Sequence, residues 1–346
     1  MPSALRDRYA GLVCDLDGVV YLGSQAVPYA VEELTAAGGG PAAGVVYATN
    51  NASRTPSDVA AQLCHLGLQT EADQVINSSM AGAAVIADRF PPGAGVLAVG
   101  GAGVAAALQN AGLTPVQPSA AARWQGEIVA ALQGYGPQVC AADLAEVAFA
   151  VQAGAAWIVT NDDRTLPTER GVAPGNGSLV GAVRMAVDLD PEVVGKPGPL
   201  MYEMAARLLG VSAGQTLAVG DRLETDIAGA HAAGMDALLV LTGVHGPVDL
   251  VRCEPGLRPR YVASDLRSLS KPYEEPQRTQ GGWQIGEVTA ILEVTDDECT
   301  VRCDRADAPQ TPHDVTLRLA LRAIWEGLDE GRLTQDAAVR AITAWQ

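Results

Sequence analysis

Basic side chains are scarce in this sequence, and lysine is the scarcest of them. The 346-residue chain has 23 Lys and Arg residues against 40 Asp and Glu residues, and its lysines are Lys196 and Lys271 alone. A net charge of −17 leaves no basic face that would attract nucleic acid phosphates or an anionic lipid surface. We therefore expect neither nucleic acid nor membrane as a partner, and a small molecule instead.

Long hydrophobic runs are also missing. No segment reaches the roughly 18 to 20 apolar residues that a membrane-spanning helix needs. The opening segment MPSALRDRYAGLVC lacks the apolar stretch and cleavage site of a signal peptide. The six cysteines are scattered, which is typical of reduced thiols rather than of a disulfide framework. We expect a cytoplasmic protein.

What the chain does have is a regular alternation of strand and helix patterns. Hydrophobic residues make up 48% of it, which suffices for two or three domains with buried cores. Short apolar runs at residues 12–22, 44–50 and 216–220 are each followed by helical spacing. This order favours an α/β fold with a doubly wound parallel sheet.

The alternation stops near Lys271, where the segment KPYEEPQRTQGG collects proline, glycine and charge. Such a composition is typical of a linker, which we place at residues 271–285. Residues 286–302 then alternate like an antiparallel hairpin, and two helical patterns follow. We predict a small appended α+β module at residues 286–346.

The first candidate site is Asp15-Leu16-Asp17-Gly18, directly after an apolar run. Ligands of open α/β folds bind at the carboxyl ends of the strands. Residues two apart in an extended chain face the same way, so the two carboxylates lie together. They could bind a divalent cation, with one attacking phosphorus and the other moving protons. The alternative is an acidic turn without chemistry.

Three further segments carry candidate site residues, two of them at the ends of expected strands and one just ahead of an expected helix. Thr49 and Asn50 precede the start of an expected helix. They could bind a phosphate there, or they could simply cap the helix. Lys196 stands in Gly-Lys-Pro-Gly-Pro, where a fixed ammonium could neutralise a phosphoryl group, although a surface turn is the alternative. Asp221 and Asp226 follow residues 216–220. They could bring further carboxylates to the same edge of the sheet, or they could cap the helix that follows.

Taken in this order, the four segments resemble the motifs of the haloacid dehalogenase (HAD) superfamily. The resemblance implies a HAD core and an Mg²⁺-dependent enzyme that forms an aspartyl-phosphate. It implies the following roles: Asp15 as nucleophile, Asp17 as general acid and base, Thr49, Asn50 and Lys196 on the phosphate, Asp15, the Asp17 carbonyl and Asp221 on Mg²⁺, and Asp226 supporting them. Since halide needs no acid whereas a leaving alkoxide does, Asp17 favours a phosphatase over a dehalogenase.

The stretch between the second and third motifs is too long for a loop and is expected to form an inserted α/β cap. The segments DLDGVVYLG and VVGKPGP resemble the NagD-type and phosphoglycolate-phosphatase-like branch of the superfamily. The expected division is core at 1–78, cap at 79–182 and core again at 183–270.

The cap is expected to choose the substrate, and Asn161 and Asp163 at the end of one of its strands are the candidate contacts, with loop capping as the alternative. Where relatives often carry an Asp-containing loop, this chain has residues 131–137, ALQGYGP. The appended module and scarce lysine resemble actinobacterial members of the branch that hydrolyse glycerol 3-phosphate. Phosphoglycolate and pyridoxal phosphate are the rival substrates.

Other interpretations remain open at this point. A binding or regulatory protein without activity could use the same fold, and a phosphomutase would use the same aspartyl-phosphate. Gly101-x-Gly103 after an apolar run resembles part of a dinucleotide fingerprint, but no acidic residue stands where the ribose would need one, so we predict a plain strand, turn and helix. A homodimer is possible.

Overall fold

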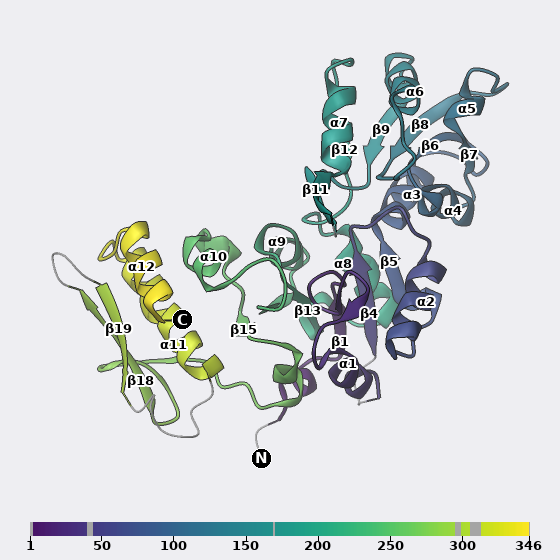
Figure 1. Cartoon of the computed structure of the whole chain (residues 1–346). Helices are drawn as coiled ribbons and strands as arrows, with labels where there is room; N and C mark the ends of the chain where they lie inside the picture. Colours follow the sequence, from purple (N-terminus) through teal and green to yellow (C-terminus); the bar gives the residue numbers. More distant parts are fainter. Residues whose placement is uncertain (1–2, 40–43, 169, 295–298, 305–312, 346) are drawn as a thin grey trace.

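The computed structural model describes residues 3–39, 44–168, 170–294, 299–304 and 313–345. Within these ranges the chain forms sheets of six, five and four strands and two small hairpins. The six-stranded sheet and its helices lie between the five-stranded part and the C-terminal part (Figure 1). We call these parts the core, the cap and the C-terminal module.

The core sheet has the order β15-β14-β13-β1-β4-β5, and all its pairs are parallel. Its strands are β1 (Gly11–Cys14), β4 (Val45–Thr49), β5 (Val75–Asn77), β13 (Thr216–Gly220), β14 (Asp236–Val240) and β15 (Tyr261–Ala263). The main helices around it are α1 (Ala30–Gly38), α2 (Pro56–Leu66), α8 (Leu200–Leu209), α9 (Ala228–Ala232) and α10 (Pro247–Arg252). The predicted doubly wound parallel sheet is confirmed.

Alternate residues of the core strands bury on opposite faces of the sheet. Leu12 and Cys14 of β1 join a cluster with residues of α1 and α2, whereas Val13 joins a cluster with residues of α8 and α9. Because both faces are covered, the central strands are apolar throughout. Polar groups are left for the strand ends.

Helix α2 shows how local sequence sets the elements. Thr55 caps it by accepting a hydrogen bond from the Asp58 backbone N–H at 3.2 Å, and Pro56 occupies the first turn. Gly67 ends the helix with φ +107°, a conformation that glycine adopts without steric cost. Residues Thr55, Pro56 and Gly67 therefore set the start and the end of this helix.

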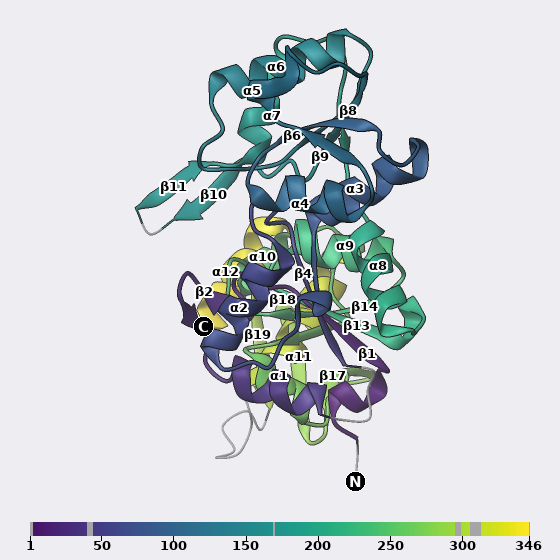
Figure 2. The same ribbon diagram turned by 90° about the vertical axis from the view of Figure 1, so that its right-hand side faces the viewer.

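The cap sheet has the order β12-β9-β8-β6-β7. Its strands are β6 (Gly95–Val99), β7 (Thr114–Val116), β8 (Ile128–Gln133), β9 (Ala156–Val159) and β12 (Glu192–Val193). Its helices are α3 (Ser78–Arg89), α4 (Ala102–Asn110), α5 (Pro118–Ala121), α6 (Ala141–Gln152) and α7 (Asn176–Arg184). A hairpin of β10 (Thr165–Thr168) and β11 (Gly171–Pro174) projects from it (Figure 2). Strand β12 lies beyond residue 182, where we expected the cap to end.

The two glycines of the partial dinucleotide fingerprint have a packing role in the structure. A Cβ at Gly101 would lie 2.2 Å from the Ser53 carbonyl oxygen, and one at Gly103 would lie 2.4 Å from that of Arg54. The Gly103 N–H also donates to the Ser53 carbonyl at 3.2 Å. The start of α4 therefore rests directly on a core loop, and the segment is the predicted strand, turn and helix.

The C-terminal module is an antiparallel sheet, β16-β17-β18-β19, with two helices. Its elements are β16 (Gln277–Thr279), β17 (Gly282–Ile285), β18 (Val288–Val294), β19 (Cys299–Asp304), α11 (His313–Asp329) and α12 (Gln335–Trp345). The expected hairpin and helices are present. The segment 271–285, expected as a linker, instead contains β16 and β17, because its Thr-Gln-Gly-Gly sequence forms the turn between them.

Hairpin β2 (Tyr21–Leu22) and β3 (Gln25–Ala26) follows β1. Among the described residues, we find no helix that combines the length and the apolar character needed to cross a membrane.

Candidate active site

The carboxyl edge of the core sheet gathers the sequence-predicted residues of four segments. Asp15 follows β1, Thr49 ends the neighbouring β4, and Asp221 follows β13 on the other side of β1. They line a cavity of about 640 Å³ together with Lys196 and residues of the cap. Parallel strands that point the same way bring these distant segments to one place.

Lys196 stands between two carboxylates. Its Nζ lies 2.6 Å from Oδ1 of Asp15 and 2.8 Å from Oδ1 of Asp226, and its side chain is only 2% exposed. Burial would lower the pKa of Lys196, but the two carboxylates outweigh it and hold that pKa above its ordinary value. The ammonium is therefore a fixed positive charge beside Asp15.

Asp221 is fully buried, and the backbone on both sides fixes its carboxylate. A Cβ at Gly18 would lie 2.4 Å from Oδ2 of Asp221, and one at Gly243 would lie 1.9 Å from it. The backbone N–H of Val244 donates to the same Oδ2 at 2.7 Å. The other oxygen, Oδ1, is buried without a hydrogen-bond partner, which is costly unless a ligand binds there.

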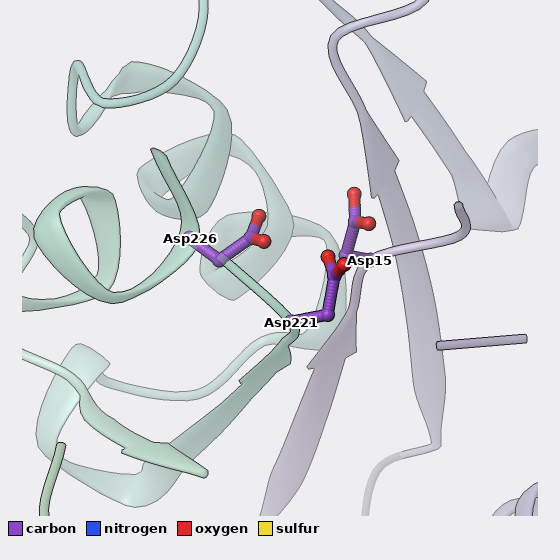
Figure 3. A group of neighbouring side chains, drawn as sticks. All are labelled: Asp15, Asp221 and Asp226. Atoms are coloured by element: carbon purple, nitrogen blue, oxygen red, sulfur yellow. The ribbon is translucent and has the colours of Figure 1, made fainter. Parts of the chain in front are cut away.

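Oxygens of Asp15, Asp221 and Asp226 lie within 4.8 Å of one another. Asp15 and Asp221 stand at strand ends, and Asp226 extends toward them from the helical turn Leu223–Ile227 that follows β13 (Figure 3). Three neighbouring carboxylates, one of which has a buried oxygen without a partner, fit a hard divalent cation such as Mg²⁺. Asp226 is engaged by Lys196 and, through Oδ2, by the Arg222 N–H at 3.1 Å. Asp15 and Asp221 are accordingly the freer ligands.

Burial also sets the protonation of the carboxyl groups. It raises the pKa of Asp221 to about 6, with the nearby charge of Asp226 adding to the rise. It raises the pKa of Asp15 as well, against the pull of Lys196. A bound cation would reverse both shifts, because it favours the ionised carboxylates.

Asp17 faces the cavity and is exposed there. Desolvation by the surrounding walls raises its pKa above the ordinary value, and the charge of Arg222 opposes the rise. A carboxyl group with a raised pKa, open to the cavity, can act as a general acid.

Asn50 was expected to contact phosphate, but its side chain is occupied by the protein. Its Oδ1 accepts from the Lys196 backbone N–H at 2.8 Å, and its Nδ2 lies 3.2 Å from the Lys196 carbonyl and 3.3 Å from Oδ2 of Asp163. The Asn50 carbonyl accepts from Nδ2 of Asn161 and Oγ of Ser78, both at 2.8 Å. Asn50 thus joins the core to both connections that lead to and from the cap.

The two candidate substrate contacts of the cap, Asn161 and Asp163, differ in how many hydrogen-bonding groups they leave free for a substrate. Nδ2 of Asn161 is bound to Asn50, and its Oδ1 accepts from the Asp163 N–H at 3.2 Å. Asp163 uses Oδ2 toward Asn50, and burial raises its pKa. Both residues line the cavity, but Asp163 has more hydrogen-bonding capacity left for a ligand.

Comparisons with known proteins identify the family of the chain. Residues 12–114 match the family described as haloacid dehalogenase-like hydrolase, and residues 193–269 match one described as HAD-hydrolase-like. A D-glycerol 3-phosphate phosphatase of Mycobacterium tuberculosis is 44% identical over 285 residues, which are 82% of this chain and 77% of that protein. The chain belongs to the haloacid dehalogenase-like hydrolases.

Further similar proteins extend the likeness. A 5′-nucleotidase of Bacillus subtilis is 37% identical over 239 residues, 68% of this chain and 88% of its own length. The crystal structure of a glycerol phosphate phosphatase from Mycobacterium tuberculosis in complex with magnesium has a TM-score of 0.81 and 37% identity, and the match covers 94% of this chain and 93% of that one. The predicted family and enzyme class are confirmed.

Several residues of this haloacid dehalogenase-like site were not predicted from the sequence. The β14–α10 loop, residues 241–246, brings Gly243 and Val244 against Asp221, and Thr242 donates to the Gly18 carbonyl at 2.6 Å. Backbone groups make most of these contacts, so no side-chain motif signals them. Arg222 lines the cavity, and its position within GDRLETD was the available signal.

Proposed function

We propose that this enzyme is an Mg²⁺-dependent phosphomonoesterase that works through an aspartyl-phosphate on Asp15. The observation that carries the proposal is the placement of the Asp15 carboxylate, 2.6 Å from the buried Lys196 ammonium and among the acidic oxygens at the edge of the sheet. Attack by a carboxylate on a phosphate dianion needs positive charge at that place.

In the first half of the proposed reaction, an Asp15 oxygen bonds to phosphorus and the bond from phosphorus to the alcohol oxygen breaks. Asp17 gives its proton to the departing alkoxide. In the second half, Asp17 takes a proton from water, whose oxygen attacks phosphorus, and the bond to Asp15 breaks. Inorganic phosphate leaves, and both carboxyl groups return to their starting states.

Asp15, Asp221 and the backbone carbonyl of Asp17 would hold Mg²⁺, and Asp226 would support the site through its bonds to Lys196 and Arg222. When bound, the ion neutralises charge on the transferring phosphoryl group. This assignment is supported by the unpartnered buried Oδ1 of Asp221.

Thr49 and Lys196 would hold the phosphoryl oxygens. The Thr49 oxygen accepts from the Asn51 N–H at 3.1 Å, which leaves its hydroxyl hydrogen available to donate. Since the side chain of Asn50 is engaged elsewhere, a contact from Asn50 to phosphate would come from its backbone N–H.

We further propose glycerol 3-phosphate as the substrate, with phosphoglycolate and pyridoxal phosphate as rivals. The Mycobacterium tuberculosis relatives named for glycerol phosphate are similar over most of the chain. The core groups address only the phosphate and its ester oxygen, so the cap must supply discrimination. Cap residues Tyr135, Asn161, Asp163 and Asn176 line the cavity.

A phosphate-release assay over a panel of small phosphomonoesters with Mg²⁺, run in parallel with Asp15→Asn, tests the proposal. Wild-type protein should release phosphate fastest from glycerol 3-phosphate, and the variant should release none above background. Phosphate release by Asp15→Asn would refute the mechanism, a different preferred ester would refute the substrate, and an isomerised phosphosugar without free phosphate would indicate a mutase.

The domain division into core, cap and appended module is part of this proposal, with the cap closing over the sheet edge. A small-molecule partner follows from the activity. Six free cysteines fit a reducing compartment and support the proposed cytoplasmic location. The absence of nucleic acid and membrane partners, and the possible homodimer, stay predictions.

A further inference from the structure

The β14–α10 loop holds the carboxylate of Asp221 in its orientation. The Val244 N–H binds Oδ2 and leaves Oδ1 free, while Gly243 packs against the carboxylate with no room for a Cβ. His245 adds a second link. Its ring Nδ1 accepts from the Leu223 backbone N–H at 2.9 Å, and its backbone N–H donates to the Asp221 carbonyl at 3.3 Å. The position of this loop therefore sets the proposed metal site.

The loop continues without a break into α10, a helix of six residues. The start of α10 is fixed locally, since Asp249 accepts from the Gly246 N–H at 2.9 Å. Its end is held by the C-terminal module. Nε1 of Trp325 donates to the Leu250 carbonyl at 2.7 Å, and Nε2 of Gln335 donates to the Val251 carbonyl at 2.8 Å.

These two donors satisfy carbonyls that the short helix cannot pair within itself. The first of them is rigidly placed. Trp325 is 4% exposed, and guanidinium groups of Arg258 and Arg322 lie 5.2 Å and 5.5 Å from its ring. Arg258 also forms two hydrogen bonds with Asp329 of α11, so the contact ties the core and α11 together at several points.

We propose that the C-terminal module stabilises the geometry of the metal site through its contacts with α10, with Trp325 and Gln335 as positioning residues for Asp221. None of the module's described residues lines the cavity of the site. It fixes the end of the helix whose other end carries the loop around Asp221, and so holds Asp221 in the orientation in which its free Oδ1 would bind the cation. This inference rests on the proposed function, because it concerns the Mg²⁺ site assigned there.

The module offers a matched control for Trp325. Trp283 of β17 is also packed against the main hydrophobic cluster, but its Nε1 is buried without a hydrogen-bond partner in the described structure. Trp325→Phe and Trp283→Phe therefore remove the same atoms from the same module. Of these two changes, Trp325→Phe removes a bond to α10.

The experiment measures Mg²⁺ binding to the full-length, substrate-free protein by isothermal titration calorimetry. We expect Trp325→Phe and Gln335→Ala each to raise the Kd for Mg²⁺ about threefold or more, as loss of one coupled hydrogen bond would, and Trp283→Phe to leave it unchanged. Hydrogen exchange of peptides from residues 241–250 should speed up in the first two variants alone. Saturating Mg²⁺ should restore their kcat.

The result that overturns the inference is a Kd for Mg²⁺ that stays at the wild-type value in both α10-contacting variants, whatever happens to their Tm. In that case the module contributes to folding alone. Should Trp325→Phe fail to fold, Gln335→Ala carries the test, since its side chain lies at the edge of the contact. Asp221→Asn separates the two proposals, because wild-type binding that survives this change refutes the metal site itself.

Discussion

The side chain of Asn50 forms hydrogen bonds with both the backbone N–H and the backbone carbonyl of Lys196, 146 residues away in the sequence. Oδ1 of Asn50 accepts from the Lys196 N–H, and Nδ2 of Asn50 donates to the Lys196 carbonyl. A pair of bonds at one residue fixes the direction in which its side chain leaves the backbone. We infer that Asn50 determines where the ammonium meets Asp15.

The first prediction follows from that pair. Asn50→Ala should lower kcat/KM by about 10- to 100-fold, and by the same factor for polyol and aryl phosphates, because Lys196 acts on the phosphoryl group that all esters share. The measurement is steady-state kinetics with both substrate types. Asn51→Ala is the control, since within the part of the chain that the structure describes the exposed Asn51 side chain accepts hydrogen bonds from Ser53 alone. A comparable loss there would contradict the role of Asn50.

The second prediction concerns Asp17. Asp17→Asn keeps the shape of the side chain but neither donates nor accepts the required proton, so both formation and hydrolysis of the phospho-enzyme should slow by about 100-fold or more. Rapid-quench measurement of the two steps checks this. An aryl phosphate with an acidic leaving group should show a smaller loss in the first step alone, and an equal loss in that step would argue against proton donation by Asp17.

The third prediction separates the two cap residues. Asp163→Ala should reduce kcat/KM for a polyol phosphate by about 10-fold or more while sparing an aryl phosphate, since this carboxylate can accept from a substrate hydroxyl. Asn161→Ala should affect both substrates equally, because its amide is bound to Asn50 and Asp163. Circular dichroism confirms folding. If Asp163→Ala also lowers kcat/KM equally for polyol and aryl phosphates, the specificity site lies elsewhere in the cap.

The fourth prediction uses the raised pKa of Asp221, about 6 against an ordinary value of 3.8. The folded state therefore holds this proton more tightly than the unfolded state does, and the metal-free protein loses stability as pH rises from about 4 to above 6, on the order of 3 kcal/mol at most. Asp221→Asn should raise the Tm of metal-free protein at pH 7.5 and change it little near pH 4.

Mg²⁺ provides the complementary measurement for Asp221. The ion binds the ionised carboxylate, so it should raise the Tm of wild-type protein more at pH 7.5 than at pH 5. A stabilisation by Mg²⁺ that does not depend on pH, or a lower Tm for metal-free Asp221→Asn at pH 7.5, would show that burial does not penalise this charge.

The sequence was informative where chemistry resides in side chains at strand ends. Asp15, Thr49 and Asp221 could be placed together because parallel strands share one carboxyl edge. Lys196 follows β12 of the cap sheet, so its place beside them rested on the family resemblance. The side-chain bonds of Asn50 could not be anticipated, because they go mainly to backbone groups of segments that the fold alone brings near. The same holds for Val244, whose contribution is an N–H that every residue but proline has.

The C-terminal boundary shows a different limit. Proline, glycine and charge mark a change of direction in the chain, but they do not distinguish a linker from a hairpin turn. Residues 277–285 therefore looked like a connection although they supply two strands. Their pairing partner in the module, β18, lies close by in sequence, and the apolar Trp283 and Ile285 were the signal for it.

The scarcity of lysine has a practical consequence. Lys196 is buried, and its ammonium is held by two carboxylates, whereas Lys271 is exposed just ahead of the C-terminal module. An amine-directed fluorophore or crosslinker would therefore react with Lys271 in preference to the active-site lysine. The wild-type sequence thus provides a single exposed side-chain amine for attaching a probe beside the module, with no engineered cysteine.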